Sequence, residues 1–148
     1  GGWTGGTKDA EGNACVQDKV CGPDNVSFME IGRTLLIGED TSRRNNNYVW
    51  AFNLDTRKLA RILSVPMNAE ATGLNVLENI NGFAYITSNF QHPGEDRGTP
   101  YGSNPLANYT GADKAEVLSA INTKWNNRKR AAIGYIGTKE GALPALNP

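Results

Sequence analysis

The sequence predicts a mostly β protein with one helix near the C-terminal end of the chain. Between Val26 and Phe90, short apolar runs alternate with turn residues about every ten positions, which is the rhythm of a sandwich, barrel or propeller. The 17 glycines and 7 prolines slightly exceed the usual share, which suits short strands and many turns. After residue 110 the spacing of the apolar residues changes to that of a helix.

The length of 148 residues allows one ordinary domain. Within it we expect three regions. Residues 1–25 form a loop or linker that holds both cysteines, residues 26–95 form antiparallel strands, and residues 96–148 form a loop, a helix, a short strand and a tail.

The strands follow from apolar runs bounded by turn residues. Residues 26–30 and 34–38 are expected to pair around a turn at Gly32. Within the second strand, residues 35–37 form a continuous apolar run, which is typical of a strand covered on both faces. The other predicted strands are 48–54 with 59–63 as the clearest hairpin, 74–77 with 83–87 around the tight-turn pair Asn81-Gly82, and a last strand at 131–136.

An amphipathic helix is expected over about residues 113–127. Asp113 is the predicted N-cap, and Glu116 three positions later would complete a capping box. The basic run at 128–130 suits the negative end of the helix dipole, so we interpret it as a helix end and not as a nucleic-acid patch. The apolar residues expected on one face are Val117, Leu118, Ile121 and Trp125.

The charge balance argues against two classes of partner. Fifteen basic and fifteen acidic residues cancel, so no net field favours nucleic acid or an anionic membrane surface. No apolar run approaches the length of a membrane span. The start at Gly1 has neither an initiator Met nor a signal-peptide pattern, so we expect a processed, cut or incompletely built chain.

The two cysteines, Cys15 and Cys21, lie six positions apart in a loop-like segment. In an exported protein this pattern favours a short disulfide loop. Two unrelated thiols are the plain alternative. A two-cysteine metal site fits less well, because the usual spacing is shorter, but one of the pair as a lone metal ligand stays open.

Carboxylates and the only histidine fall at predicted strand ends. Glu39 and Asp40 follow the buried run, where paired carboxylates are costly unless something cationic meets them. His92 and Glu95 lie in the turn Gln91-His92-Pro93-Gly94-Glu95, directly after an apolar strand. Clustered oxygens suit calcium or another hard metal, and polar turns on a rigid scaffold are common places for a site.

Five short segments then occur in order: Cys21-Gly22-Pro23-Asp24-Asn25-Val26, Leu35-Leu36-Ile37-Gly38-Glu39-Asp40, Asn47-Tyr48-Val49-Trp50, Ala69-Glu70-Ala71-Thr72-Gly73 and Gln91-His92-Pro93-Gly94-Glu95. In this order they resemble the PhoX-like alkaline phosphatases, exported bacterial enzymes once grouped as a domain of unknown function. The resemblance covers roughly residues 21–95 and does not extend to the helix or the tail.

The resemblance implies a β-propeller with inserted helices, in proteins much longer than this chain. The chain would then be a C-terminal portion with about two blades, an incomplete β-propeller segment of one larger domain. Open blades expose edges and apolar faces, so we expect this segment to pack on a missing N-terminal stretch or on a companion chain. The implied location is the periplasm or the outside of the cell.

The implied activity is hydrolysis of a phosphomonoester with calcium and iron. Metals and arginines would neutralise the charge of the phosphate ester in the transition state. His92 would be a ligand or would orient one through a hydrogen bond, and no catalytic residue is assigned. The expected metal residues are Glu39, Asp40, Glu70, Glu95 and His92, and the expected phosphate-binding residues are Arg43, Arg44 and Arg97.

Each of these residues also has a plain structural interpretation. His92 would be a hydrogen-bonded turn residue, Glu39 and Asp40 a solvated strand end, and Glu70 part of an ordinary turn. The arginines would then lie in a solvated loop. The matching alternative function is a non-catalytic, calcium-stabilised propeller segment used for assembly or binding.

Overall fold

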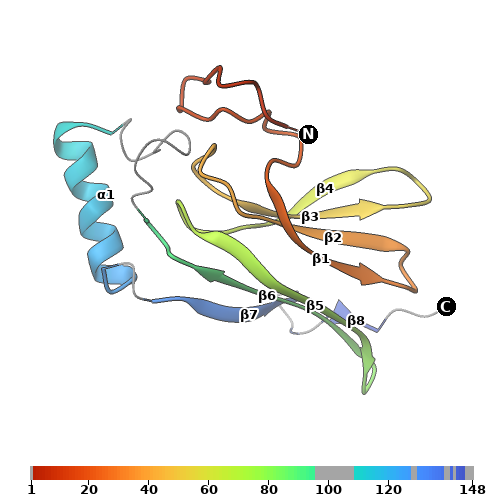
Figure 1. Cartoon of the computed structure of the whole chain (residues 1–148). Coiled ribbons are helices and arrows are strands. Elements are labelled where there is room, and N and C mark those ends of the chain that lie inside the picture. Colours follow the sequence, from red (N-terminus) through yellow and green to blue (C-terminus); the bar gives the residue numbers. More distant parts are fainter. Residues whose placement is uncertain (1, 96–108, 128–129, 139–140, 142, 146–148) are drawn as a thin grey trace.

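The computed structural model describes residues 2–95, 109–127, 130–138, 141 and 143–145. These residues form two antiparallel four-stranded sheets and one helix, so the mostly β prediction is confirmed. Figure 1 shows the two sheets stacked on each other, with the helix at one end and the N-terminal segment above the first sheet.

The first sheet contains four strands in chain order, each paired with the next. Its last turn is held by the side chain of Asn53, whose Oδ1 accepts from the backbone N–H of Thr56 at 2.9 Å. Asn side chains commonly stabilise turns in this way. The strands are β1 (Pro23–Met29), β2 (Thr34–Glu39), β3 (Tyr48–Asn53) and β4 (Leu59–Ser64).

The second sheet has the order β5-β6-β7, and β8 pairs with β6. The β5–β6 hairpin turns at Asn81 and Gly82, which both have positive φ (52° and 85°). This backbone matches the tight turn that the Asn-Gly pair predicts. The strands are β5 (Glu70–Ile80), β6 (Phe83–Gln91), β7 (Ala132–Ile136) and β8 (Leu143–Pro144).

In this sheet two strands are longer than the sequence predicted, and one strand was not predicted. β5 begins at Glu70, inside the segment expected to be a connector, and β6 continues to Gln91. The pairing of β5 is irregular between Thr72 and Asn75, where Gly73 has a φ of +62°. Such a bulge interrupts the alternation that marks a strand in sequence. β8 lies in the segment that was expected to be a tail rich in Gly and Pro.

The core lies between the two sheets. Leu36 and Val49 of the first sheet are fully buried, and Val49 packs with Val65, Ala69 and Ala71. A Cβ on Gly38 would come within 2.6 Å of the carbonyl oxygen of Ala71, so only a glycine permits this close approach of β2 to β5. Small residues therefore set the spacing of the sheets at this end.

The outer face of each sheet exposes apolar side chains over part of its area. On the first sheet Val26 is 61% exposed, and Phe28, two positions along and on the same face, is 44% exposed. On the second sheet Ile133 is 86% exposed and Tyr135 is 55% exposed. In the strand expected to be covered on both faces, by contrast, Leu36 is buried and its neighbours Leu35 and Ile37 are half-buried.

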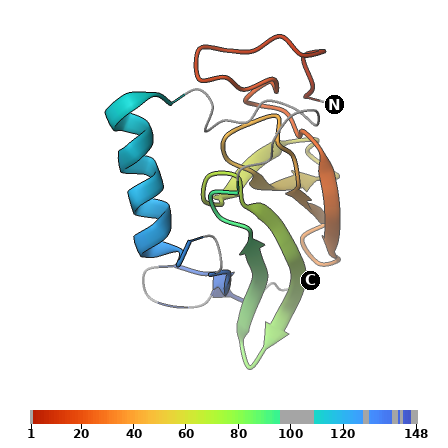
Figure 2. The same cartoon turned by 60° about the vertical axis from the view of Figure 1, so that its left-hand side comes forward.

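Ile121 of the helix α1 (Gly111–Lys124) is buried and lies against Gly94 in the turn after β6. Figure 2 shows the helix and the sheets from a second side. Its N-cap is Thr110, which makes no side-chain capping hydrogen bond, so the expected cap at Asp113 was wrong. Asp113 instead lies in the first turn, where its charge suits the helix dipole. Trp125 ends the helix and contacts Phe90 edge to face, with ring centroids 5.1 Å apart.

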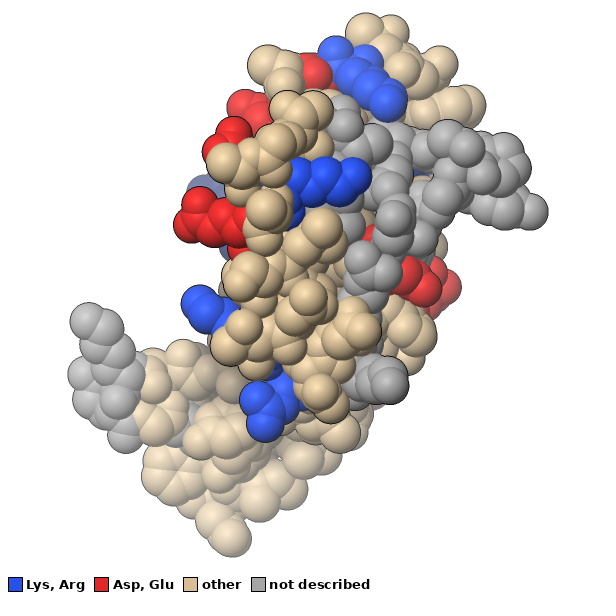
Figure 3. All heavy atoms as spheres, turned by 90° about the vertical axis from the view of Figure 1, so that its left-hand side faces the viewer, with Lys and Arg blue, Asp and Glu red and all other residues tan. Residues whose placement is uncertain are grey.

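The surface on the helix side carries interspersed charges of both signs. Figure 3 shows no continuous patch of one sign over the described atoms on this face. This agrees with the absence of net charge in the sequence. No helix in the described ranges is long and apolar enough to cross a membrane.

Candidate functional site

The strand ends that carry the expected site residues lie at one end of the stacked sheets, which we call the polar end (residues 39–48, 67–70 and 91–95). Glu70 at the start of β5 is paired with Gln91 at the end of β6. The backbone N–H of Gly94 donates to the carbonyl of Met67 at 2.6 Å. These contacts bring together segments that are far apart in the sequence.

Glu39 lies at the centre of the polar end and is fully buried. Its Oε1 accepts from the backbone N–H of Cys21 at 2.7 Å and from Nε1 of Trp50 at 2.8 Å. Its Oε2 accepts from the backbone N–H of Tyr48 at 3.0 Å. Three N–H donors, one from Cys21 and two from β3, therefore converge on one carboxylate.

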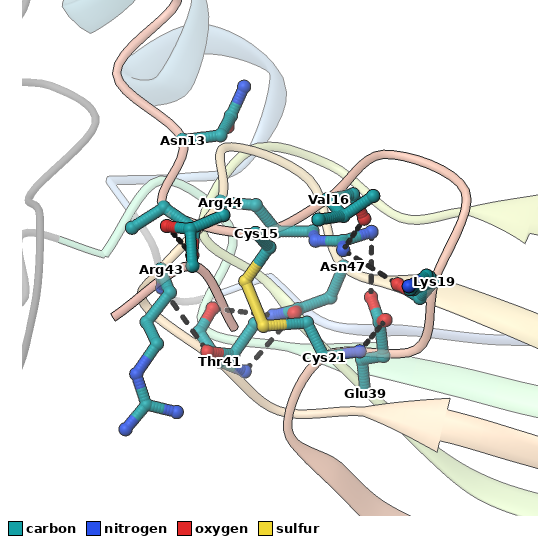
Figure 4. The surroundings of a disulfide bond; sticks show 12 residues. Asn13, Cys15, Val16, Lys19, Cys21, Glu39, Thr41, Arg43, Arg44 and Asn47 are labelled. Atoms are coloured by element: carbon teal, nitrogen blue, oxygen red, sulfur yellow. Dashed lines mark hydrogen bonds and ion pairs between the residues drawn. A yellow bond between two sulfur atoms is a disulfide. The ribbon is translucent and has the colours of Figure 1, made fainter. Parts of the chain in front are cut away.

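The cation that faces Glu39 is the guanidinium of Arg44, at 3.6 Å between Nη1 and Oε2. Arg44 is 1% exposed. Its Nη2 donates to the carbonyls of Val16 and Lys19 at 3.0 and 2.9 Å, and its guanidinium lies 5.1 Å from the ring centre of Tyr48. Figure 4 shows this guanidinium between Glu39 and the loop that holds Val16 and Lys19.

Burial and pairing act on these two groups in opposite directions. Burial raises the pKa of the Glu39 carboxyl above its ordinary value, and the N–H donors and the charge of Arg44 oppose this without reversing it. Burial lowers the pKa of Arg44, and the charge of Glu39 opposes that shift. Both shifts reflect the desolvation penalty of an ion pair held inside the protein.

This arrangement differs from both sequence expectations for Glu39. The carboxylate is neither at a solvated strand end nor among the other carboxylates, because Arg44 and the backbone surround it. Arg44, expected at a phosphate, is likewise enclosed. Asp40 is half-buried beside this pair, and its backbone N–H donates to the carbonyl of Gly22 at 3.0 Å.

The histidine turn is tight, as expected, with the N–H of Glu95 donating to the carbonyl of His92 at 3.0 Å. His92 has a φ of +55° and an exposed side chain, whereas Pro93 and Gly94 are buried. Asn68 donates from Nδ2 to the carbonyl of Glu95, which ties the turn to the segment before β5. The turn thus presents the imidazole outward.

Two of the remaining candidates, Glu70 and Arg43, have partners within the protein. Glu70 is half-buried and accepts a hydrogen bond from Nε2 of Gln91. Arg43 is half-buried, and its guanidinium lies 5.1 Å from the ring centre of Trp3. Arg97 lies outside the described residues.

Cys15 and Cys21 form a disulfide, and both are buried. The pairing closes the loop 15–21 (hereafter the disulfide loop). The carbonyls of Val16 and Lys19 in this loop are the two that receive Arg44. The cysteines are therefore part of the surroundings of Glu39, although they are distant from it in sequence.

Sequence reasoning missed the asparagines that hold the polar end together. Asn47 is fully buried; its Oδ1 accepts from the N–H of Thr41 at 3.1 Å, and its Nδ2 donates to the carbonyl of Ala69 at 2.8 Å. Asn13 in turn accepts from the N–H of Asn45 at 2.7 Å. The run 45–47 resembles a solvated loop in sequence, because an asparagine gives no sign of whether its amide faces water or backbone.

The donors at the polar end suit calcium in type, since they are carboxylate and amide oxygens. One of them, Oδ1 of the buried Asn68, has no hydrogen-bond partner among the described residues. However, the described residues bring no group of three His, Cys, Asp or Glu side chains to one point. The described residues therefore do not form a complete calcium or iron site by themselves.

Comparison with known proteins finds no matching family model, no similar curated protein and no similar solved structure.

Proposed function

We propose that the chain is the C-terminal portion of a PhoX-like alkaline phosphatase, a metal-dependent phosphomonoesterase built on a β-propeller. The observation that carries this proposal is the gathering of Asp40, Glu70 and the histidine turn at one end of the stacked sheets. These are strand ends that the resemblance implicates, and the segments that hold Asp40 and His92 are separated by well over half of the resembling region.

The propeller part of the proposal is supported by the form of the sheets. The first sheet is a four-stranded antiparallel meander, which is the form of a propeller blade. Each sheet has one covered face, and over part of its other face it exposes apolar side chains. In the proposed propeller the exposed faces pack on neighbouring blades, supplied by an N-terminal stretch or by a companion chain.

The metal part of the proposal assigns roles to the other expected site residues. Asp40, Glu70 and Glu95 would supply oxygens to calcium, and the exposed His92 would bind iron or orient a ligand. Ligands from other blades would complete the site. When bound, the metals would neutralise the charge of a phosphate ester, a task shared with Arg43 and, by the resemblance, Arg97.

Glu39 and Arg44 have another role in this proposal. Because they pair with each other, they hold the strand ends at fixed positions and do not contact the phosphate. The disulfide is compatible with an exported protein, and we place the phosphatase in the periplasm or outside the cell.

The test is hydrolysis of p-nitrophenyl phosphate by the chain in its natural full-length context. We expect turnover that is lost with EGTA and restored by calcium. Glu70→Gln should lower the affinity of the enzyme for calcium by about 10–100-fold, the range for changes around a metal site. The matched control, Asp55→Asn, alters a carboxylate at the far turn of the first sheet and should have no effect. No turnover at any loading of calcium and iron would refute the phosphatase.

The second candidate is a non-catalytic propeller segment that calcium stabilises. The internal pairing of Glu39 with Arg44 favours it, since it removes two of the expected site residues from any ligand. The two candidates differ in one result. Calcium should raise the thermal midpoint in both cases, whereas turnover should accompany it only in the phosphatase.

A further inference from the structure

The disulfide loop covers the buried pair of Glu39 and Arg44. From this loop, the N–H of Cys21 donates to Glu39, and the carbonyls of Val16 and Lys19 accept from Arg44. The loop therefore supplies three of the polar contacts that compensate the buried charges. Figure 4 shows these contacts side by side with the sulfur–sulfur bond.

The loop also anchors the N-terminal segment. Gly2 donates its N–H to the carbonyl of Val20 at 2.7 Å, and its carbonyl accepts from the N–H of Val16 at 2.7 Å. A Cβ on Gly2 would come within 2.9 Å of the carbonyl oxygens of Lys19 and Val20, so the backbone fits closely into the loop. Opening the loop would release this segment as well.

The buried guanidinium of Arg44 has few polar partners that compensate for its loss of water. Nε and Nη1 of Arg44 have no hydrogen-bond partner among the described residues, although Nη1 lies 3.6 Å from Glu39. A buried charge that loses further partners strongly favours contact with water. Losing the two loop carbonyls would leave Arg44 with Glu39 and the ring of Tyr48 as its compensating partners.

We propose that the Cys15–Cys21 disulfide is a redox-controlled latch: it holds the loop over the Glu39–Arg44 pair, and its reduction exposes that pair to water. The reductant is a dithiol. It gives two electrons and two protons to the disulfide, which becomes two thiols, and the dithiol becomes a disulfide. The two sheets stay folded. The proposal is independent of the phosphatase assignment, since it concerns only this chain's own contacts.

The coupling works in both directions. The sulfurs belong to residues that are 3% and 2% exposed, so a dithiol reaches them only when the loop opens. Arg44 holds the loop closed through two carbonyls. Removing the guanidinium should therefore accelerate reduction, just as reduction should loosen the surroundings of the guanidinium.

The first experiment uses the wild-type chain, oxidised or reduced with dithiothreitol and alkylated. Trypsin cleaves after Lys19 and Arg44, and the products are followed by mass spectrometry. We expect cleavage at these two sites to be at least about tenfold faster in the reduced chain, the lower end of what a disulfide contributes to loop closure. Cleavage after Lys58 in the β3–β4 turn should not change, and the circular dichroism of the sheets should persist.

The second experiment measures how fast dithiothreitol reduces the disulfide in Arg44→Met and in the control Arg33→Met. Arg33 pairs with Asp55 on the exposed far side of the first sheet. We expect about tenfold faster reduction in Arg44→Met only, if its circular dichroism matches the wild type. If Arg44→Met does not fold, the wild-type experiment decides alone.

Two results would overturn the latch. One is a reduced wild-type chain as resistant to trypsin after Lys19 and Arg44 as the oxidised chain. The other is loss of the sheet signal on reduction, because the disulfide would then support the whole fold and not a local cover.

Discussion

The indole N–H of Trp50 donates to Oε1 of Glu39 at 2.8 Å, from β3 across to the end of β2. Trp50 is 2% exposed and Glu39 is fully buried, so the bond links an aromatic core residue to a buried carboxylate. The same oxygen accepts from Cys21, which places the disulfide loop, β2 and β3 around one atom. This point of convergence makes the polar end sensitive to changes at a single residue.

Replacing Glu39 with alanine should strongly destabilise the chain. It leaves the charge of Arg44 buried without a counter-charge, and such changes lower the free energy of unfolding by about 3–5 kcal/mol. Urea unfolding followed by Trp fluorescence measures this. The control Asp55→Ala breaks an exposed ion pair with Arg33 and should cost less than about 1 kcal/mol.

The double variant Glu39→Leu with Arg44→Met should be more stable than Glu39→Ala alone. It removes both charges, so no ion stays buried without its partner. The double variant should still be less stable than the wild type, because the N–H donors of Cys21 and Tyr48 lose their acceptor. A double variant at least as unstable as Glu39→Ala would show that the charge of Arg44 is not the cause.

The stabilising contribution of Glu39 should depend on pH with a defined sign. Burial raises the pKa of its carboxyl in the folded chain, so the folded chain binds more protons than the unfolded chain between the two pKa values. The contribution is fully present below the unfolded pKa and falls as the pH rises toward the folded pKa.

Urea unfolding of the wild type and Glu39→Gln at a series of pH values from about 4 upward tests this sign. The free energy of the wild type minus that of the variant should decrease with rising pH. A difference that is constant or increases would mean that the N–H donors and Arg44 outweigh burial.

Gly94→Ala should disturb the docking of α1. A Cβ there would lie 2.5 Å from Cδ1 of Ile121, and Gly94 has a φ of +72°. The matched control is Gly82→Ala, with a φ of +85° and no atom within 4 Å. Gly82→Ala should lower the free energy of unfolding by about 1–2 kcal/mol, because of the strained backbone alone. Gly94→Ala should lower it by about 1–3 kcal/mol more, because the new methyl group overpacks the contact with Ile121.

Shortening Ile121 to valine in the Gly94→Ala background should restore part of the loss, because it makes room for the new methyl group. The fluorescence of Trp125, which contacts Phe90, reports whether the helix stays in place. Equal destabilisation by the two glycine substitutions would argue against this contact between the turn and the helix.

The apolar outer faces should tolerate charge in the isolated chain. Val26→Lys and Ile133→Lys should each change the free energy of unfolding by less than about 1 kcal/mol, since both side chains are largely exposed. They should also reduce the binding of a hydrophobic dye. By contrast, Leu36→Ala on the inner face should cost about 2–5 kcal/mol. A large loss of stability in either lysine variant would mean that these faces are packed within the chain.

Local patterns were sufficient for the elements that they determine. The β3–β4 hairpin and the Asn81-Gly82 turn follow from alternation and turn chemistry within a few residues, and both are present. The start of β5 was missed because Gly73 breaks the alternation. β8 was missed because its two residues form a strand only by pairing with β6. These elements depend on tertiary contacts that no local pattern contains.

The partners of the expected site residues were not predictable from the sequence. Glu39 was expected at a metal or at a solvated strand end, whereas it is buried against Arg44. Arg44 was expected at a phosphate or in a solvated loop, and the sequence separation of the two gives no hint of their pairing. Asn47 was missed for the same reason, because its role depends on Ala69, 22 positions away.

The stacking of the two sheets also has a consequence for how the chain folds. The first sheet is a succession of hairpins, and β5 and β6 form another, so these strands are close neighbours along the chain. By contrast, the hydrogen bond from Asn25 to Ala71 spans 46 residues, and β6 pairs with β7 across the segment that holds the helix. Closing a long loop is entropically unfavourable until the contacts that it permits are made, so nearby pairings form early and distant ones late. The hairpins should therefore appear first in time, and the joining of β5 to β1 and β2 and of β7 to β6 should be the slow steps.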